Sequence, residues 1–215
     1  MSSHISRRAF AETITFEDAA AIAAHNVRAA APHRIRFELG ALPFDGDVMH
    51  APLVLLVGSP ACDMNAARAA RKSPRRGWPL SGLCPDAPAG LRALWGARLA
   101  SLIDAFGAQH VANSVAALPL TPWACDEFDE RLRLPSRTRM LEVANAAARR
   151  GAFLLVTGCD DPWMEAPEVA RLGHELRLHP KSFRPTHVSI ENVGATAWHA
   201  ICRRIETHHW KRLTA

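Results

Sequence analysis

The most informative segment of the chain is Pro52-Leu53-Val54-Leu55-Leu56-Val57-Gly58-Ser59-Pro60-Ala61-Cys62-Asp63. Its first part is a continuous apolar run of branched side chains, which is typical of a strand covered on both faces in a parallel sheet. The run ends at Gly58-Ser59-Pro60, where the chain must turn sharply. Ligands of open parallel sheets bind outside the carboxyl ends of the strands, so this turn is the first place to look for chemistry. An ordinary corner between a strand and a loop would have the same sequence.

Helical and strand patterns alternate along the rest of the chain, which predicts a three-layer α/β/α sandwich with a mainly parallel central sheet of about four strands. Residues 1–12 read as disordered, and 13–215 as a single domain. The predicted helices cover 15–31, 90–106, 135–150, 167–177 and 195–205, and the predicted strands 34–39, 53–57, 111–118, 153–156 and 183–192. If the last four strands share one sheet, its carboxyl rim carries Ser59, Pro119, Gly158 and Asn192.

Composition limits the class of protein. A chain of 215 residues that is 48% hydrophobic can bury the core of one domain, and two full domains are not expected. No apolar run approaches the ~20 residues that a membrane-spanning helix needs. Met1–Phe10 lacks the apolar segment of a secretion signal, so we expect a cytoplasmic location and no membrane partner.

The cysteines indicate reduced thiols. They are odd in number, widely spaced and never arranged as Cys-x-x-Cys, which does not fit a disulfide framework, a zinc site or an iron–sulfur cluster. They are Cys62, Cys84, Cys125, Cys159 and Cys202. We therefore expect no metal and no cofactor.

The charge favours an anionic partner. The formal net charge is +5, and no acidic residue lies between Asp63 and Asp86. Within that interval a basic run is formed by Arg68, Arg71, Lys72, Arg75 and Arg76. Such a run directly after the organising strand is expected to contact nucleic-acid phosphates. A solvated loop is the alternative interpretation.

The order of motifs resembles the uracil-DNA glycosylase superfamily, particularly its bacterial members, over roughly residues 42–205. Val57-Gly58-Ser59-Pro60-Ala61 looks like the Gly-x-Asn-Pro-Gly or Gly-x-Ala-Pro-Gly loop that ends a strand in that family. The segment 111–122 stands where the family has the strand that leads to residues packing on the base. Ser189-Ile190-Glu191-Asn192 looks like the final element, which approaches the minor groove of DNA.

The resemblance implies a protein that binds DNA, single-stranded DNA included, and hydrolyses the bond between an altered base and its sugar. Such a base must leave the stack to be reached, and the pocket then holds it by stacking and by hydrogen bonds to its edge. The implied base pocket comprises Gly58, Pro60, Asn113, Trp123 and Phe128. The resemblance also implies that Ser189 contacts DNA together with the basic run. It implies a catalytic role for Asn192, beside residues near the Gly58-Ser59-Pro60 turn. For Trp123 and Phe128, packing in the core is the alternative role.

The chain departs from the family pattern where water is activated. Ser59 stands where active members often have Asn or Asp, and a serine hydroxyl is neither a useful base nor a stabilising anion. Asp63 and Asn65 lie a few residues further on and are the expected substitutes. The His-Pro-Ser signature of the final loop is also missing.

Two other functions fit the sequence. One is a catalytically silent nucleic-acid-binding module of the same fold. The other is a different α/β hydrolase that uses Asp160 and Asp161 at a strand end with a divalent metal. An Asp-Asp-Pro sequence is equally natural as a turn and helix cap.

Overall fold

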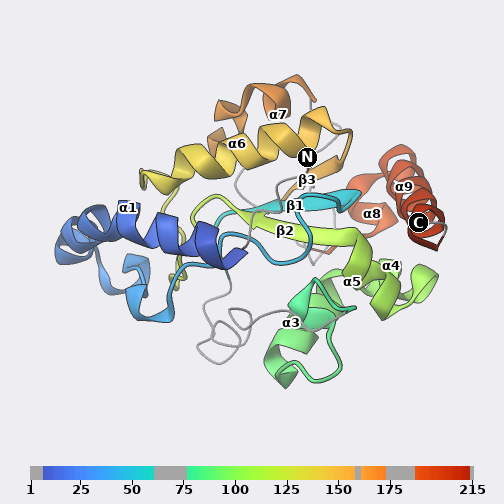
Figure 1. Ribbon diagram of the computed structural model, residues 1–215, viewed down its shortest axis with the longest axis horizontal. Helices are drawn as coiled ribbons and strands as arrows, with labels where there is room; N and C mark the ends of the chain where they lie inside the picture. The colour runs from blue at the N-terminus through green and yellow to red at the C-terminus, as the bar shows by residue number, and fades with distance from the viewer. Residues whose placement is uncertain (1–6, 61–76, 158–160, 173–186, 214–215) are drawn as a thin grey trace.

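The computed structural model describes residues 7–60, 77–157, 161–172 and 187–213, and residues 161 and 209–213 by their backbone alone. It is an α/β arrangement in which helices surround a small parallel sheet (Figure 1). The helices are α1 (Arg7–Arg28), α3 (Ala89–Arg98), α4 (Ala100–Phe106), α5 (Ala108–Ser114), α6 (Ser136–Arg149), α7 (Pro167–Arg171), α8 (Ile190–Val193) and α9 (Ala195–Leu213). The strands are β1 (Leu53–Val57), β2 (Val115–Pro119) and β3 (Phe153–Val156), and short 3-10 helices cover Ala31–His33, Phe37–Leu39, Ser81–Leu83 and Asp161–Glu165.

The sheet confirms the organising role of residues 53–57. Its order is β2-β1-β3 and both pairings are parallel, so β1 is the central strand. Leu53 pairs with Val115 on one side and with Phe153 on the other, and Val57 pairs with Pro119. All three strands therefore end at the same rim. Within the described residues the sheet has three strands rather than the predicted four.

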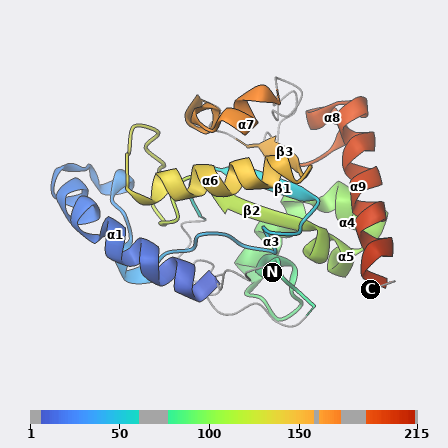
Figure 2. The same ribbon diagram turned by 45° about the horizontal axis from the view of Figure 1, so that its top comes forward.

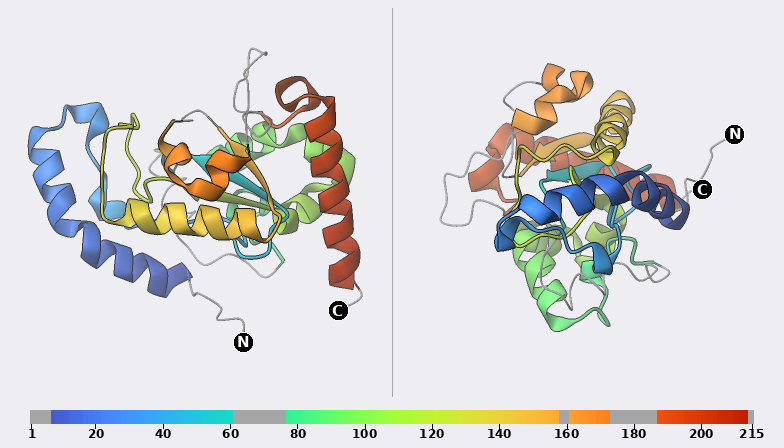
Figure 3. Two further views of the ribbon diagram at one scale, coloured as in Figure 1. Left: turned by 90° about the horizontal axis from the view of Figure 1, so that it is seen from above. Right: turned by 90° about the vertical axis from the view of Figure 1, so that its left-hand side faces the viewer.

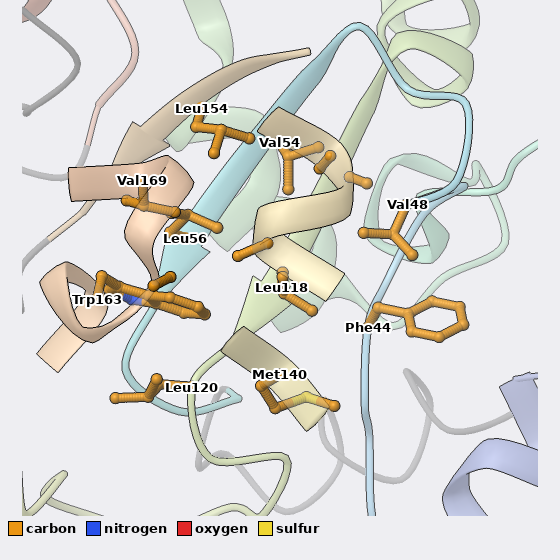
Figure 4. Close-up of a cluster of buried hydrophobic side chains, with 14 of the residues drawn as sticks. Phe44, Val48, Val54, Leu56, Leu118, Leu120, Met140, Leu154, Trp163 and Val169 are labelled. Carbon is orange, nitrogen blue, oxygen red and sulfur yellow. The ribbon is translucent and has the colours of Figure 1, made fainter. Parts of the chain in front are cut away.

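Helices pack on both faces of the sheet. Alternate side chains of the strands point to opposite faces, and the register aligns them into two sets. One set, which includes Val54 and Leu56, packs with Met140 and Ala144 of α6. Figure 4 shows side chains from all three strands gathered with Met140 and Trp163. The other set packs against buried residues of α3, α5 and α9, which are Leu91, Trp95, Val111, Ile201 and Ile205.

The predicted strand at 34–39 is wrong. Ile35 is buried as the alternation required, but its backbone bonds to a side chain: Asn26 Nδ2 donates to the Ile35 carbonyl, and the Ile35 N–H donates to Asn26 Oδ1. The next residues form a 3-10 turn at Phe37–Leu39. A side-chain amide that satisfies both backbone groups removes the need for a neighbouring strand.

The predicted strand at 111–118 is half right. Residues up to Ser114 belong to helix α5, and the strand begins at Val115. Val111 and Ala112 are fully buried in the same cluster as Val115. A short apolar run is equally compatible with a buried helix and a buried strand, so its periodicity did not reveal the change.

The predicted final strand is wrong in its described part. Residues 190–193 form the short helix α8, with Ser189 at its N-cap, and Gly194 separates α8 from α9. The backbone N–H of Val188 donates to the Arg98 carbonyl at the end of α3, not to a strand. The range 173–186 lies outside the described residues.

The expected disorder of residues 1–12 is wrong from Arg7 onward, because α1 begins there and Ile14, Asp18 and Ile22 of this helix are buried. The helix expected over 90–106 is divided at Leu99, which leaves helical dihedrals and separates α3 from α4. In the described part of the chain, no helix is both long enough and apolar enough to span a membrane.

Candidate functional site

The carboxyl rim of the sheet is the candidate site, because the turn after β1 lies there beside the chain that continues β2. The Leu120 N–H donates to the Val57 carbonyl at 2.8 Å, and the Thr121 N–H donates to the Gly58 carbonyl at 3.0 Å. On the other side of β1, the Thr157 N–H donates to the Leu56 carbonyl at 2.8 Å. These bonds extend the ladder past the strand ends and hold Gly58 in place.

Phe128 closes over this turn. A Cβ atom added to Gly58 would lie 2.7 Å from Cδ1 of the Phe128 ring, closer than real Cβ contacts allow. Glycine at this position therefore lets an aromatic ring pack directly on the backbone. Phe128 is only half-buried, so part of its surface faces solvent. The sequence predicted Gly58 and Phe128 as members of one pocket, and the structure brings them into contact.

Ser59 and Pro60 continue the turn, Ser59 half-buried and Pro60 buried. Thr121 and Thr157 are buried at the neighbouring strand ends. The polar side chains described just after the three strands are therefore those of Ser59, Thr121 and Thr157. They provide hydroxyl groups and no carboxylate. Asp63 and Asn65, the predicted substitutes for the water-activating residue, lie outside the described residues.

The acids of the loop after β2 are engaged with an earlier part of the chain. Asp126 pairs with Arg36 at 2.7 Å, and the Glu127 carboxylate lies 3.7 Å from His33 Nε2. The backbone N–H of Glu127 also donates to the Pro32 carbonyl. These contacts fix the loop that carries Phe128, so the two acids have a positioning role here.

Trp123 is a core residue, which corrects its assignment to the base pocket. Its side chain has no exposed surface, its Nε1 donates to Asp18 Oδ2 at 2.7 Å, and its ring stacks on Phe37 with centroids 4.9 Å apart. Tryptophan is retained in cores where its N–H finds a partner. With both faces in contact with protein, this ring cannot stack on a base.

Asn113 is also not at the rim. It lies on helix α5, and its Nδ2 donates to the Gly77 carbonyl at 3.1 Å and to the Gln109 carbonyl at 2.7 Å. α5 precedes β2, so Asn113 lies toward the amino ends of the strands. Its amide holds the segment before Leu80 against the helix. The assignment as a reader of the base edge is therefore wrong.

The described part of the predicted final element does not pair with the sheet, although Val188 packs in the core cluster on one of its faces. Asn192 is buried in α8, where its Nδ2 donates to the His187 carbonyl at 2.8 Å. The Ser189 hydroxyl bonds to the Glu191 carboxylate, and this bond lowers the pKa of Glu191. A carboxylate beside Ser189 disfavours a phosphate there. Figure 2 shows α8 beside α9, at the end of the molecule away from α1.

Several predicted site residues lie outside the described residues. They are the basic run, namely Arg68, Arg71, Lys72, Arg75 and Arg76, together with Asp160 and the side chain of Asp161. Within the part of the chain that the structure describes, no group of three His, Cys, Asp or Glu side chains is arranged to hold a metal ion. Cys84 and Cys202 are free thiols.

A buried carboxylate that the sequence did not single out lies beside β2. Asp45 Oδ1 accepts from the Ser81 N–H at 3.0 Å, Oδ2 accepts from the Ser81 hydroxyl at 2.9 Å, and Arg7 lies 3.8 Å away. Its backbone forms an antiparallel bridge with Ala117. Burial raises the pKa of Asp45, and the bonds from Ser81 oppose that rise. Pro43-Phe44-Asp45-Gly46 reads as a plain turn, and no sequence signal marks the acid as buried.

Comparisons with protein-family models, with curated proteins and with solved structures found no match.

Proposed function

We propose that this chain is a divergent uracil-DNA glycosylase-like protein that binds DNA and excises an altered base by hydrolysis of its N-glycosidic bond. The observation that supports the proposal is the contact of Phe128 with Gly58 at the end of the central strand. A half-exposed ring against a Gly-Ser-Pro turn offers a flat apolar surface on which an extruded base can stack. Stacking of this kind is worth about 1–3 kcal/mol per base.

The proposal extends to the architecture and to the location. Two separate core clusters lie on the two faces of the sheet, and this supports a three-layer α/β/α sandwich for the whole domain. Action on DNA would place the protein in the cytoplasm.

The chemistry would depend on a residue near the turn that can stabilise positive charge. Departure of a base leaves such charge on the sugar, and a carboxylate stabilises it and orients water, as in other glycoside hydrolyses. The hydroxyls of Ser59, Thr121 and Thr157 cannot do this near neutral pH. Asp63 follows Pro60 by three residues and Asn65 by five, so we assign the chemistry to this pair.

The direct test is incubation of the purified protein with single- and double-stranded oligonucleotides that carry a panel of altered bases, uracil included, scored for abasic sites. We expect at least one altered base to be released, and Phe128→Ala to weaken binding of that oligonucleotide. Phe16→Ala is the matched control, because Phe16 is 87% exposed on α1. Equal losses in the two variants would remove Phe128 from the site.

Asp63→Asn should lower turnover by about 10²–10³, the loss seen when a group that stabilises transition-state charge is removed. Ser59→Ala should do less, because it removes only a neutral hydroxyl. If Asp63 only caps a helix instead, as Asp often does, Asp63→Asn should lower stability by no more than ~1 kcal/mol and leave turnover intact. Full activity of Asp63→Asn would transfer the role to another residue.

The second candidate is a silent nucleic-acid-binding module of the same fold. Two observations favour it: the described side chains at the rim carry hydroxyls, and Asp126 is paired with Arg36 while Glu127 lies 3.7 Å from His33. This candidate predicts salt-dependent binding of oligonucleotides without abasic sites for any base in the panel.

A further inference from the structure

An open cleft lies at the opposite end of the strands from the candidate site. It occupies about 390 Å³, within the usual range of small-molecule sites. It lies where β1 and β3 begin and where α9 passes them. Its lining residues are His50, Pro52, Arg150, Gly151, Ala152, Ala200, Arg203, Arg204, Thr207 and His208. Figure 3 shows α9 and α1 at opposite ends of the molecule. Pro52 and Ala152 line the cleft just before β1 and β3, whereas Gly58 follows β1, so the cleft is separate from the rim that carries Phe128.

The cleft is strongly cationic. Three guanidinium groups line it, from Arg150, Arg203 and Arg204, together with two imidazoles. Among the residues that the structure describes, no carboxylate lies within 4.0 Å of these guanidinium groups. Asp47 lies nearby, where it contacts His50 Nδ1 at 3.0 Å and its charge reaches Arg150. The residues that line the cleft include three arginines and no acid, so the lining carries an excess of positive charge.

Two of the arginines are held in place by backbone carbonyls. Arg150 donates to the Val48 carbonyl at 2.8 Å, and Arg204 donates to the Gly151 carbonyl at 3.3 Å and the Ala200 carbonyl at 3.4 Å. The Arg204 guanidinium also lies 5.4 Å from the centre of the Phe153 ring. A guanidinium has five N–H donors, so each keeps donors for an anion after these bonds. Side chains fixed in this way lose little entropy on binding.

Arg150 and Arg204 hold the chain around Gly151 in place through their bonds to backbone carbonyls. This structural role accounts for their presence without any ligand. It does not explain Arg203, which is exposed on α9, lines the same cleft and forms no ion pair with a described residue. Like charges repel, so an anion bound among three guanidinium groups would be favoured by all of them. The rest of the lining includes Pro52, Ala152 and Ala200, which offer an apolar wall.

From this convergence we propose that the cleft binds a small phosphorylated molecule with two or more negative charges on adjacent phosphoryl groups. Arginine suits such a ligand because its planar fork donates two parallel hydrogen bonds to phosphoryl oxygens. A cleft of this volume has room for more than one phosphoryl group and a small organic portion against the apolar wall. The five residues of β1 span ~16 Å, so this ligand would not overlap a base bound at the carboxyl rim.

The test is isothermal titration of the full-length protein with inorganic pyrophosphate at constant ionic strength. We expect saturable binding with one site, weakened about tenfold or more by Arg203→Gln, since hydrogen bonds between charged groups are the strong ones. Arg203 has no described side-chain partner, so this variant leaves the fold intact. Arg28→Gln is the matched control: Arg28 is exposed on α1 and, like Arg204, bonds a carbonyl four residues earlier.

A second pair of variants tests the cleft by charge alone. Thr207 is exposed and lines the cleft, and its hydroxyl bonds only to the Arg203 carbonyl one turn earlier. Thr207→Glu should abolish pyrophosphate binding, and Thr207→Gln, of the same shape, should preserve it. Absence of binding by the wild type at millimolar pyrophosphate would overturn the proposal. Equal weakening by Arg28→Gln, or binding only of a 5′-phosphorylated oligonucleotide and not of pyrophosphate, would do the same.

Discussion

Arg98 is a half-buried charged side chain, and the part of the chain that the structure describes gives it no charged partner. It ends helix α3, its Nε is buried and has no hydrogen-bond partner among the described residues, and burial lowers its pKa. The guanidinium lies 5.3 Å from the centre of the Trp95 ring, a contact worth about 0.5–2 kcal/mol. Loss of hydration costs such a group more than this contact returns.

Arg98→Met should therefore stabilise the protein. Methionine keeps the apolar contact with Trp95 and buries no charge, so we expect a gain of roughly 1 kcal/mol, or about 2–4 °C in melting temperature for a chain of this size. Differential scanning calorimetry measures the shift. Arg92→Met is the control, because Arg92 is exposed on the same helix and donates to the Pro85 carbonyl. A lower melting temperature for Arg98→Met would show that the contact with Trp95 outweighs the cost of burial.

Asp45 should make stability depend on pH. Burial raises its pKa in the folded protein above the ~3.9 of an unfolded aspartate. Between these two pKa values the folded protein keeps the proton and the unfolded chain loses it. Each pH unit in that window then lowers the free energy of unfolding by up to about 1.4 kcal/mol, and the loss is complete above the folded pKa.

Asp45→Asn should remove this dependence, because the amide can still bond to both the N–H and the hydroxyl of Ser81. We expect the difference in unfolding free energy, variant minus wild type, to rise with pH from about 4 and then to level off. Urea unfolding at steps of pH measures it. Asp104→Asn, an exposed control on α4, should follow the wild-type profile. A difference that stays constant over pH 4–8 would contradict the assignment.

At the scale of elements, Asp18 joins three segments that lie far apart in the sequence. It lies on α1, its Oδ2 accepts from Trp123 Nε1, and its Oδ1 accepts from the Ser136 N–H at 2.9 Å. The second bond satisfies the first turn of α6, which has no side-chain cap from its own neighbours. Asp18 is fully buried, so both bonds are made away from water.

Asp18→Ala should cost about 2–6 kcal/mol of unfolding free energy, because it leaves two buried donors unpaired at roughly 1–3 kcal/mol each. Asp18→Asn should cost less, since its carbonyl oxygen can still accept one of the two bonds. Chemical denaturation measures both. Glu12→Ala, at an exposed position of the same helix, should change stability by no more than about 0.5 kcal/mol. A similar cost for Glu12→Ala would show that α1 as a whole is sensitive.

The elements that the sequence predicted well are those whose burial pattern is complete within one segment. β1 and β3 are continuous apolar runs, and α6 shows helical spacing and is closely followed by Gly151, whose φ is 82°. The elements that it missed depend on distant partners. The alternation around Ile35 predicted its burial correctly, but the two hydrogen bonds with the Asn26 side chain determine the backbone conformation there. Trp123 looked like a stacking residue because the partners that bury it, Asp18 and Phe37, come from elsewhere in the chain.

At the scale of the whole molecule, the three parallel strands place two different surfaces at their two ends. The carboxyl rim has the Gly58 turn, the Phe128 ring and hydroxyls, and the amino end has the cleft with three arginines. The sequence predicted the rim because the rule for parallel sheets needs only the strand ends. It did not predict the cleft, because Arg150 follows α6 and Arg203 lies on α9, and the two meet only through the packing of α9.

The two surfaces should respond differently to salt, which allows them to be told apart. Each phosphate that a protein neutralises on single-stranded nucleic acid contributes about −0.7 to the slope of log affinity against log salt. If the basic run from Arg68 to Arg76 contacts the backbone, the triple variant Arg71→Glu, Arg75→Glu, Arg76→Glu should flatten the slope by about 2. The corresponding cleft variant, Arg150→Gln, Arg203→Gln, Arg204→Gln, should leave the oligonucleotide slope unchanged and abolish pyrophosphate binding.

Fluorescence anisotropy of a labelled oligonucleotide from 50 to 300 mM salt measures both slopes. A slope that depends on the cleft variant alone would move the nucleic-acid contact to the amino end of the sheet, and a slope near zero for the wild type would assign the basic run to solvent.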